Sequence, residues 1–84
     1  MDRRHRFAAN MKRARAKLGI SQEELSFRCK LHLTTISHYE RGGRKPGMDA
    51  MVKLAGALET TPTALCAGIE WLPDRQRFRV EKPS

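Results

Sequence analysis

Apolar side chains recur with helical spacing near the start of the chain. Phe7, Met11, Ala14 and Leu18 follow one another at alternating intervals of four and three residues, so they share one face of a helix. Gly19 suits the position just after the last helical residue, because glycine readily adopts the left-handed conformation found there. The pattern predicts an amphipathic first helix that begins at Phe7.

Local start and stop signals predict four further helices. Ser21 followed three residues later by Glu24 is a capping box that begins a second helix. A third helix ends at the glycine pair that starts with Gly42, and Thr61 before Pro62 begins a short fifth one. The predicted helices after the first cover residues 21–29, 33–41, 48–58 and 62–67.

The fourth predicted helix carries an apolar stripe of its own, which we expect to pack in the core or in an interface. A methionine stripe at helical spacing indicates packing far more often than a metal or cofactor site. The stripe consists of Met48, Met51, Val52, Ala55 and Leu58.

The last part of the chain, residues 68–84, changes from helical spacing to alternation. Ile69 and Trp71 alternate with polar residues, and so do Phe78 and Val80. Pro73 and the aspartate after it are typical of a turn. The tail is therefore expected to form a two-stranded hairpin with one apolar face, the alternative being a disordered tail. Because an isolated hairpin is marginal in water, that face should pack on the helices or pair with a second copy.

Composition narrows the class of protein. The 84 residues suffice for one domain with a modest core, and no apolar run approaches the roughly 20 residues of a membrane span. Neither a signal peptide nor a zinc-like spacing around Cys29 and Cys66 is visible. We expect a cytoplasmic protein with reduced thiols, no metal, no cofactor and no membrane partner.

The positive charge lies in one half of the chain. The net charge is +8; residues 1–45 hold twelve Lys and Arg against four acidic residues, whereas residues 46–84 hold five of each. A one-sided excess indicates a polyanionic partner, although a merely solvated surface is the alternative. Residues 1–6 are expected to form a basic arm, which either reaches DNA or is a frayed end.

Residues 21–42, "SQEELSFRCKLHLTTISHYERG", combine a helix, a short turn and a second helix rich in uncharged polar residues. With "SQEEL" followed by "TIS-x-x-ERG" at this spacing, the stretch resembles the phage repressor/Cro family, the XRE-type helix-turn-helix regulators. The resemblance implies an all-α, five-helix DNA-binding domain over residues 7–67, to which the tail is added. It also implies that the third helix lies in the major groove of double-stranded DNA.

Four residues on the outward face of the third helix are the expected base contacts. Leu33 offers only an apolar contact, such as with a thymine methyl, whereas Thr34 can also hydrogen-bond. His38 suits a guanine acceptor or a phosphate, and Ser37 suits either role. A solvated histidine is the alternative for His38 taken alone.

Other residues are expected to contact the DNA backbone or to hold the fold. The resemblance implies phosphate contacts for Gln22 and Thr35 and an internal ion pair between Arg15 and Glu40. Arg41, Arg44 and Lys45 suit phosphates by charge and place, and His32, a poor helix cap, is a further phosphate candidate.

No arrangement of side chains in the sequence indicates an enzyme. The expected function is a sequence-specific transcriptional regulator, by default a repressor, which binds a two-fold-related operator as a homodimer. The dimer contact is expected either in the tail, through Ile69, Trp71, Phe78 and Val80, or in the region of the fourth and fifth helices. The alternatives are an antitoxin or another regulator with a protein partner, a restriction–modification controller, and a non-specific nucleic-acid binder.

Overall fold

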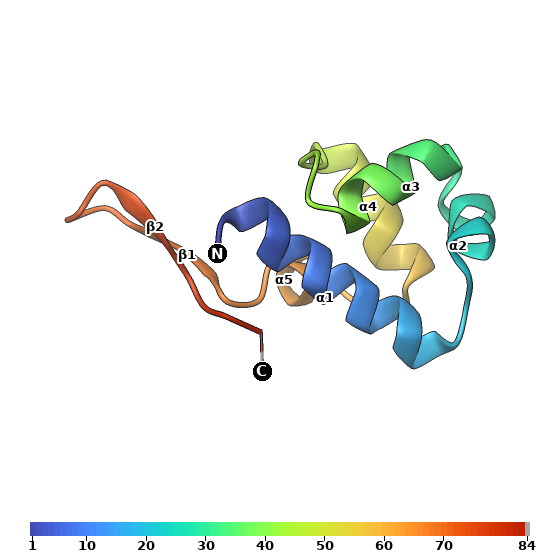
Figure 1. Cartoon of the computed structure of the whole chain (residues 1–84), viewed down its shortest axis with the longest axis horizontal. Helices are drawn as coiled ribbons and strands as arrows, with labels where there is room; N and C mark the ends of the chain where they lie inside the picture. Colours follow the sequence, from blue (N-terminus) through green and yellow to red (C-terminus); the bar gives the residue numbers. More distant parts are fainter. Residues whose placement is uncertain (84) are drawn as a thin grey trace.

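The computed structural model describes residues 1–83, which form five helices followed by a two-stranded antiparallel sheet (Figure 1). This agrees with the predicted fold class, and the tail forms the expected hairpin. The helices pack together, and the hairpin projects from them at one end of the molecule (Figure 1). The elements are α1 (Arg3–Leu18), α2 (Gln22–Cys29), α3 (Leu33–Glu40), α4 (Met48–Ala57), α5 (Pro62–Leu65), β1 (Ile69–Leu72) and β2 (Arg77–Val80).

The first helix begins at Arg3 rather than at Phe7. Asp2 is its N-cap, and one carboxylate oxygen of Asp2 accepts a hydrogen bond from the backbone N–H of His5 at 2.9 Å. Residues 3–6 therefore belong to α1, and the expected separate arm over residues 1–6 is wrong. Apolar spacing alone places the start too late, because the first turn of α1 is charged and has no apolar stripe.

The remaining helix ends follow the local signals. The Ser21 hydroxyl accepts a hydrogen bond from the N–H of Glu24 at 3.0 Å, and Thr61 caps α5 in the same way. His32 stands at the N-cap of α3 but makes no capping hydrogen bond. Lys30 ends α2 in the left-handed conformation with φ of 58°, a conformation that costs a side chain about 1–2 kcal/mol.

Each of the five helices contributes one fully buried large side chain to a single core. Burying such a side chain contributes about 1.5–3 kcal/mol relative to leaving it in water. At one side of this core the rings of Phe7 and Tyr39 meet edge to face, with 6.5 Å between their centroids. The five central residues are Met11, Leu25, Ile36, Leu54 and Leu65.

The predicted apolar stripe of α4 is divided between the core and the surface. Met48 is 80% exposed and Val52 is 57% exposed, whereas Leu54, Ala55 and Leu58 face the core. This helix has apolar residues on nearly all its sides, so periodicity alone does not decide which stripe is buried. The packing of α4 against α2 and α5 decides it.

Side chains of α1 attach the hairpin to the helices. Arg6 donates from Nε to the carbonyl of Ala67 at 2.9 Å and from Nη1 to that of Glu81 at 3.0 Å. The Asn10 amide donates to the carbonyl of Ala67 as well, at 2.9 Å. A Cβ atom at Gly68 would lie 2.7 Å from the Arg6 guanidinium, and the φ of Gly68 is +85°, so this position requires glycine.

Within the hairpin, Ile69 pairs with Val80 and Trp71 pairs with Phe78, which places all four on one face as predicted. At the base of this face Ile69 packs against the core, and the Arg3 guanidinium of α1 lies over the Phe78 ring. The Trp71 and Phe78 rings touch edge to face at 5.0 Å between centroids, yet these residues are 48% and 42% exposed. Among residues 1–83, no helix is long and apolar enough to cross a membrane.

Candidate nucleic-acid interface

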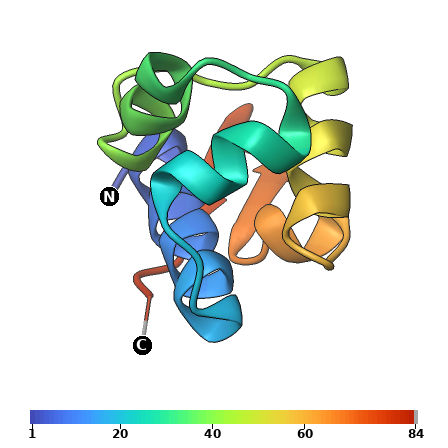
Figure 2. The same cartoon turned by 90° about the vertical axis from the view of Figure 1, so that its right-hand side faces the viewer.

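The helix pair α2 and α3 lies at the end of the molecule opposite the hairpin (Figure 1), and Figure 2 views this end directly. Lys30, Leu31 and His32 form the tight turn between the two helices. The left-handed Lys30 reverses the chain, and the Ser26 hydroxyl donates a hydrogen bond to the carbonyl of Leu31 across the turn. The turn therefore fixes the angle at which α3 leaves α2.

Helix α3 has one buried and one accessible side. Ile36, Tyr39 and Glu40 are buried, whereas Leu33 is 42% exposed and Thr34 is exposed as well. Because the first two residues of α3 are accessible, this end of the helix can approach a partner closely.

One turn further along α3, Ser37 and His38 are half-buried. The Ser37 hydroxyl accepts a hydrogen bond from Nη1 of Arg41 at 2.9 Å. Together with Leu33 and Thr34, these residues place uncharged polar and apolar groups on the accessible part of α3, with a cation at its end.

A buried ion pair holds α3 against α1. Arg15 donates from Nε and Nη2 to the two carboxylate oxygens of Glu40, at 2.7 and 2.9 Å, and from Nη1 to the carbonyl of Ile20 at 2.9 Å. The Glu40 side chain is only 4% exposed. Hydrogen bonding to Glu40 raises the pKa of Arg15 above its ordinary value.

Gln22 joins this pair, a contact that the sequence did not suggest. Its Nε2 donates to a carboxylate oxygen of Glu40 at 3.0 Å, so the side chain links the start of α2 to the end of α3. One proton of the amide remains for another acceptor.

The other expected phosphate contacts lie at the two ends of α3. His32, at its start, is exposed, and Thr35 is half-buried in its first turn. Arg41, Arg44 and Lys45 follow its last turn and are exposed. The structure thus places the uncharged side chains of α3 between its capping residue and a group of three cations.

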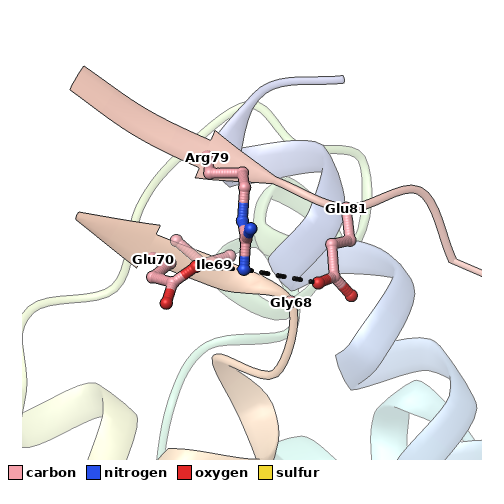
Figure 3. A pocket seen from close by; sticks show the side chains of 5 residues that line it. All are labelled: Gly68, Ile69, Glu70, Arg79 and Glu81. Carbon is pink, nitrogen blue, oxygen red and sulfur yellow. Dashed lines mark ion pairs between the residues drawn. The ribbon is translucent and has the colours of Figure 1, made fainter. Parts of the chain in front are cut away.

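The base of the hairpin forms a separate charged site, which the sequence did not indicate. Figure 3 shows the side chain of Arg79 reaching from β2 toward Glu70 on β1 and toward Glu81. The closest atoms of Arg79 and Glu81 are 3.9 Å apart, and Glu70 is nearer still. All three side chains are more than half exposed, so solvent screens these pairs.

Comparisons with known proteins place this geometry in a family. The family model "Helix-turn-helix" matches residues 11–65, which include the whole α2–α3 pair. The chain belongs to the helix-turn-helix family of phage repressor and Cro-type DNA-binding regulators. Residues 1–10 and the hairpin lie outside the matched region.

Individual relatives point in the same direction. The chain is 44% identical over 50 residues to the control protein C.BamHI from Bacillus amyloliquefaciens, a match that covers 60% of this chain and 62% of that protein. The restriction-modification controller protein C.AhdI from Aeromonas hydrophila is 32% identical, with a TM-score of 0.72 over 74% of this chain and 94% of the other. The hypothetical transcription factor NHTF from Neisseria is also 32% identical, with a TM-score of 0.75 over 88% and 80%.

Proposed function

We propose that this protein is a sequence-specific transcriptional regulator of the restriction–modification controller type. The accessible side of α3 carries the proposal, because it presents a short row of uncharged side chains flanked by groups suited to phosphates. Binding to phosphates alone would favour lysine and arginine along the whole helix. Similarity to two controller proteins supports the choice of this type of regulator.

The base contacts are assigned to the accessible residues of α3. Leu33 and Thr34 enter the major groove first, where Leu33 packs on a thymine methyl and Thr34 hydrogen-bonds a base edge. His38 binds a guanine acceptor one turn later. Ser37, which accepts from Arg41 in the free protein, contributes either to a base edge or to the placement of Arg41.

The backbone contacts fix the position of α3 without selecting a sequence. Arg41, Arg44 and Lys45 bind phosphates beyond the end of α3, and His32 and Thr35 bind them near its start. Gln22 offers its remaining amide proton to a phosphate while its other proton holds Glu40. In this assignment Gln22 couples a backbone contact to the ion pair that orients α3.

Two copies are expected to bind a two-fold-related operator, with half-sites about one helical turn, roughly 34 Å, apart. The chain offers two exposed apolar surfaces that such a dimer would bury. Met48 and Val52 lie one turn apart on α4, and Trp71 and Phe78 lie on the hairpin. Repression would follow from occlusion of the promoter. An antitoxin whose tail orders only with its partner is not favoured, because the hairpin is already paired in the single chain.

Fluorescence anisotropy with DNA from the protein's own upstream region, against a scrambled duplex at several salt concentrations, tests this function. We expect a preference of about a thousandfold or more. Changing Thr34 and His38 to alanine should remove most of the preference while the helical circular dichroism is kept. Equal affinity of the wild-type protein for both duplexes, falling together with salt, would leave a non-specific nucleic-acid binder as the better description.

A further inference from the structure

The first turn of α1 lies against the loop that follows α3. Gly42, with φ of +73°, approaches His5 so closely that a Cβ atom there would lie 2.7 Å from Cδ2 of the imidazole. Beside this contact, Asp2, Arg3, Arg4 and Lys45 line one surface hollow. The basic start of the chain is thus placed next to the cations that are proposed to bind the DNA backbone.

The hollow is positively charged. Three cations face one carboxylate. One oxygen of Asp2 accepts hydrogen bonds from the N–H and from Nδ1 of His5, both at 2.9 Å, and its other oxygen lies 4.0 Å from Nη2 of Arg4. The pKa of Asp2 is lowered to about 2, first by the backbone hydrogen bond and then by the side-chain hydrogen bond from His5. Asp2 is therefore ionised at neutral pH, and the hollow keeps a net charge of about two positive units from Arg3, Arg4 and Lys45.

The hairpin positions one of these cations. The guanidinium carbon of Arg3 lies 4.2 Å from the centroid of the Phe78 ring, a cation–π contact that restrains the side chain. The contact places the guanidinium over the face of the ring, and a guanidinium carries five N–H donors, so it can still donate to an anion. Phe78 is thus a positioning residue, and the element that carries it lies outside the helix-turn-helix match.

We propose that Arg3 and Arg4 bind a further phosphate of the DNA backbone, next to the one assigned to Lys45, at the hollow that the three side chains share. The inference rests on the proposed function and extends its interface to residues outside the family match, which begins at residue 11. The ligand is a phosphodiester, because guanidinium groups match phosphate oxygens in charge and geometry. This phosphate clamp consists of Arg3 and Arg4 of α1, Lys45 of the loop between α3 and α4, and Phe78 of β2, which positions Arg3.

Salt dependence tests the clamp with a matched control. The variant Arg3→Gln/Arg4→Gln loses two charges at the clamp, and Arg75→Gln/Arg77→Gln loses two exposed charges in the turn of the hairpin and at the start of β2. For each protein, the affinity for one duplex is measured from about 50 to 200 mM salt. The loss of one phosphate contact should reduce the slope of log K against log salt by about 1. Affinity at low salt should fall about tenfold in the first variant, and the control should match the wild type.

A second pair of variants tests the clamp by a gain of affinity. Asn caps a helix as well as Asp does, so Asp2→Asn keeps α1 and removes the opposing charge. It should tighten binding about two- to fivefold, as expected for one nearby charge in a high-dielectric setting. Asp74→Asn, at the exposed turn of the hairpin, is the control and should have no such effect. If circular dichroism shows that Arg3→Gln/Arg4→Gln does not fold, the comparison of Asp2→Asn with Asp74→Asn still tests the clamp.

The outcomes separate the clamp from the wider function. If both arginine variants lost the same affinity, or if both asparagine variants gained the same affinity, the change would depend on net charge alone. Either result would overturn the clamp. The clamp carries no base information, so the ratio of affinities for upstream and scrambled DNA should stay unchanged in Arg3→Gln/Arg4→Gln. If the wild-type protein shows no such preference, the proposed specific function fails, while the comparison of salt slopes on either duplex still tests the clamp.

Discussion

Two Arg–Glu pairs in this molecule use the same chemistry with opposite consequences. The Arg15–Glu40 pair joins α1 to α3 with a carboxylate that is 4% exposed. The Arg79–Glu70 pair crosses the hairpin with side chains that are 59% and 53% exposed. A buried ion becomes costly when its partner is removed, whereas an exposed ion is simply hydrated. The Arg15–Glu40 pair therefore matters for stability because its carboxylate is buried, and not simply because the two charges are paired.

The helical body and the hairpin, to which these two pairs belong, also differ in how they are held together. The helical body is held by a core to which every helix contributes. The hairpin is attached by hydrogen bonds from Arg6 and Asn10 to main-chain carbonyls and by Ile69 at its base, while Trp71 and Phe78 are still 48% and 42% exposed. We therefore expect the body to unfold as one unit and the hairpin to loosen separately.

The largest expected effect is that of Arg15→Met. It leaves the Glu40 carboxylate, which is 4% exposed, without its charged partner, and this should lower the free energy of unfolding by about 3–5 kcal/mol. Arg79→Met is the matched control, because it leaves an exposed carboxylate, and it should change the free energy of unfolding by no more than about 1 kcal/mol. Urea denaturation followed by far-ultraviolet circular dichroism measures both. Similar stabilities of the two variants would show that burial does not distinguish the pairs.

Arg6→Met should separate the hairpin from the helices. It removes two hydrogen bonds to the carbonyls of Ala67 and Glu81, and because these bonds are partly exposed we expect a loss of about 1–2 kcal/mol. The protein has a single tryptophan, Trp71, so its fluorescence reports on the hairpin alone. Its emission should shift to longer wavelength while helical circular dichroism is retained. Arg13→Met, an exposed change on the same helix, should leave the emission in place; a shift in both variants would contradict the anchoring role.

Lys30→Gly should produce the smallest change, a stabilisation of up to about 1 kcal/mol, because it relieves the left-handed backbone in the turn before α3. Lys30→Ala is the control: it also removes the ammonium group, which lies 4.8 Å from the centroid of the Phe27 ring, but it keeps the backbone strain. Thermal unfolding of the two variants separates these contributions. A higher melting temperature for the alanine variant than for the glycine variant would show that the turn is not strained.

Short-range signals made much of the fold predictable. The capping serine Ser21, the proline after Thr61 and the glycine after Leu18 all act within a few residues of their own position, and the structure uses each of them as expected. The alternation of apolar and charged residues around Trp71 and Phe78 likewise predicted the hairpin. It also predicted that these two side chains lie on the same face of the hairpin.

The features that the sequence did not reveal depend on long-range contacts or on ambiguous patterns. Arg6 binds carbonyls 61 and 75 residues away, and no local signal marks such a partner. Met48 and Val52 belong to a helix that is apolar on most sides, so only tertiary packing decides that they face outward. Asp2 caps α1 in a charged segment without apolar spacing, which hid the first turn of the helix.

The candidate site also combines features that the sequence made predictable with features that it did not. The accessible side of α3 could be identified from its place in the helix pair and from its uncharged residues. The hydrogen bond from Gln22 to Glu40 and the approach of Arg3 and Arg4 to Lys45 could not, because each joins segments that are distant in the sequence.

Selection from a pool of randomised duplexes tests the central claim, that the outward side of α3 recognises bases, most directly. The wild-type protein should select a two-fold-related motif with half-sites about one helical turn apart. The Thr34→Ala/His38→Ala variant should lose the preference at the positions that these residues contact and keep the half-site spacing. A selection that returns no motif, or the same motif for both proteins, would contradict the account.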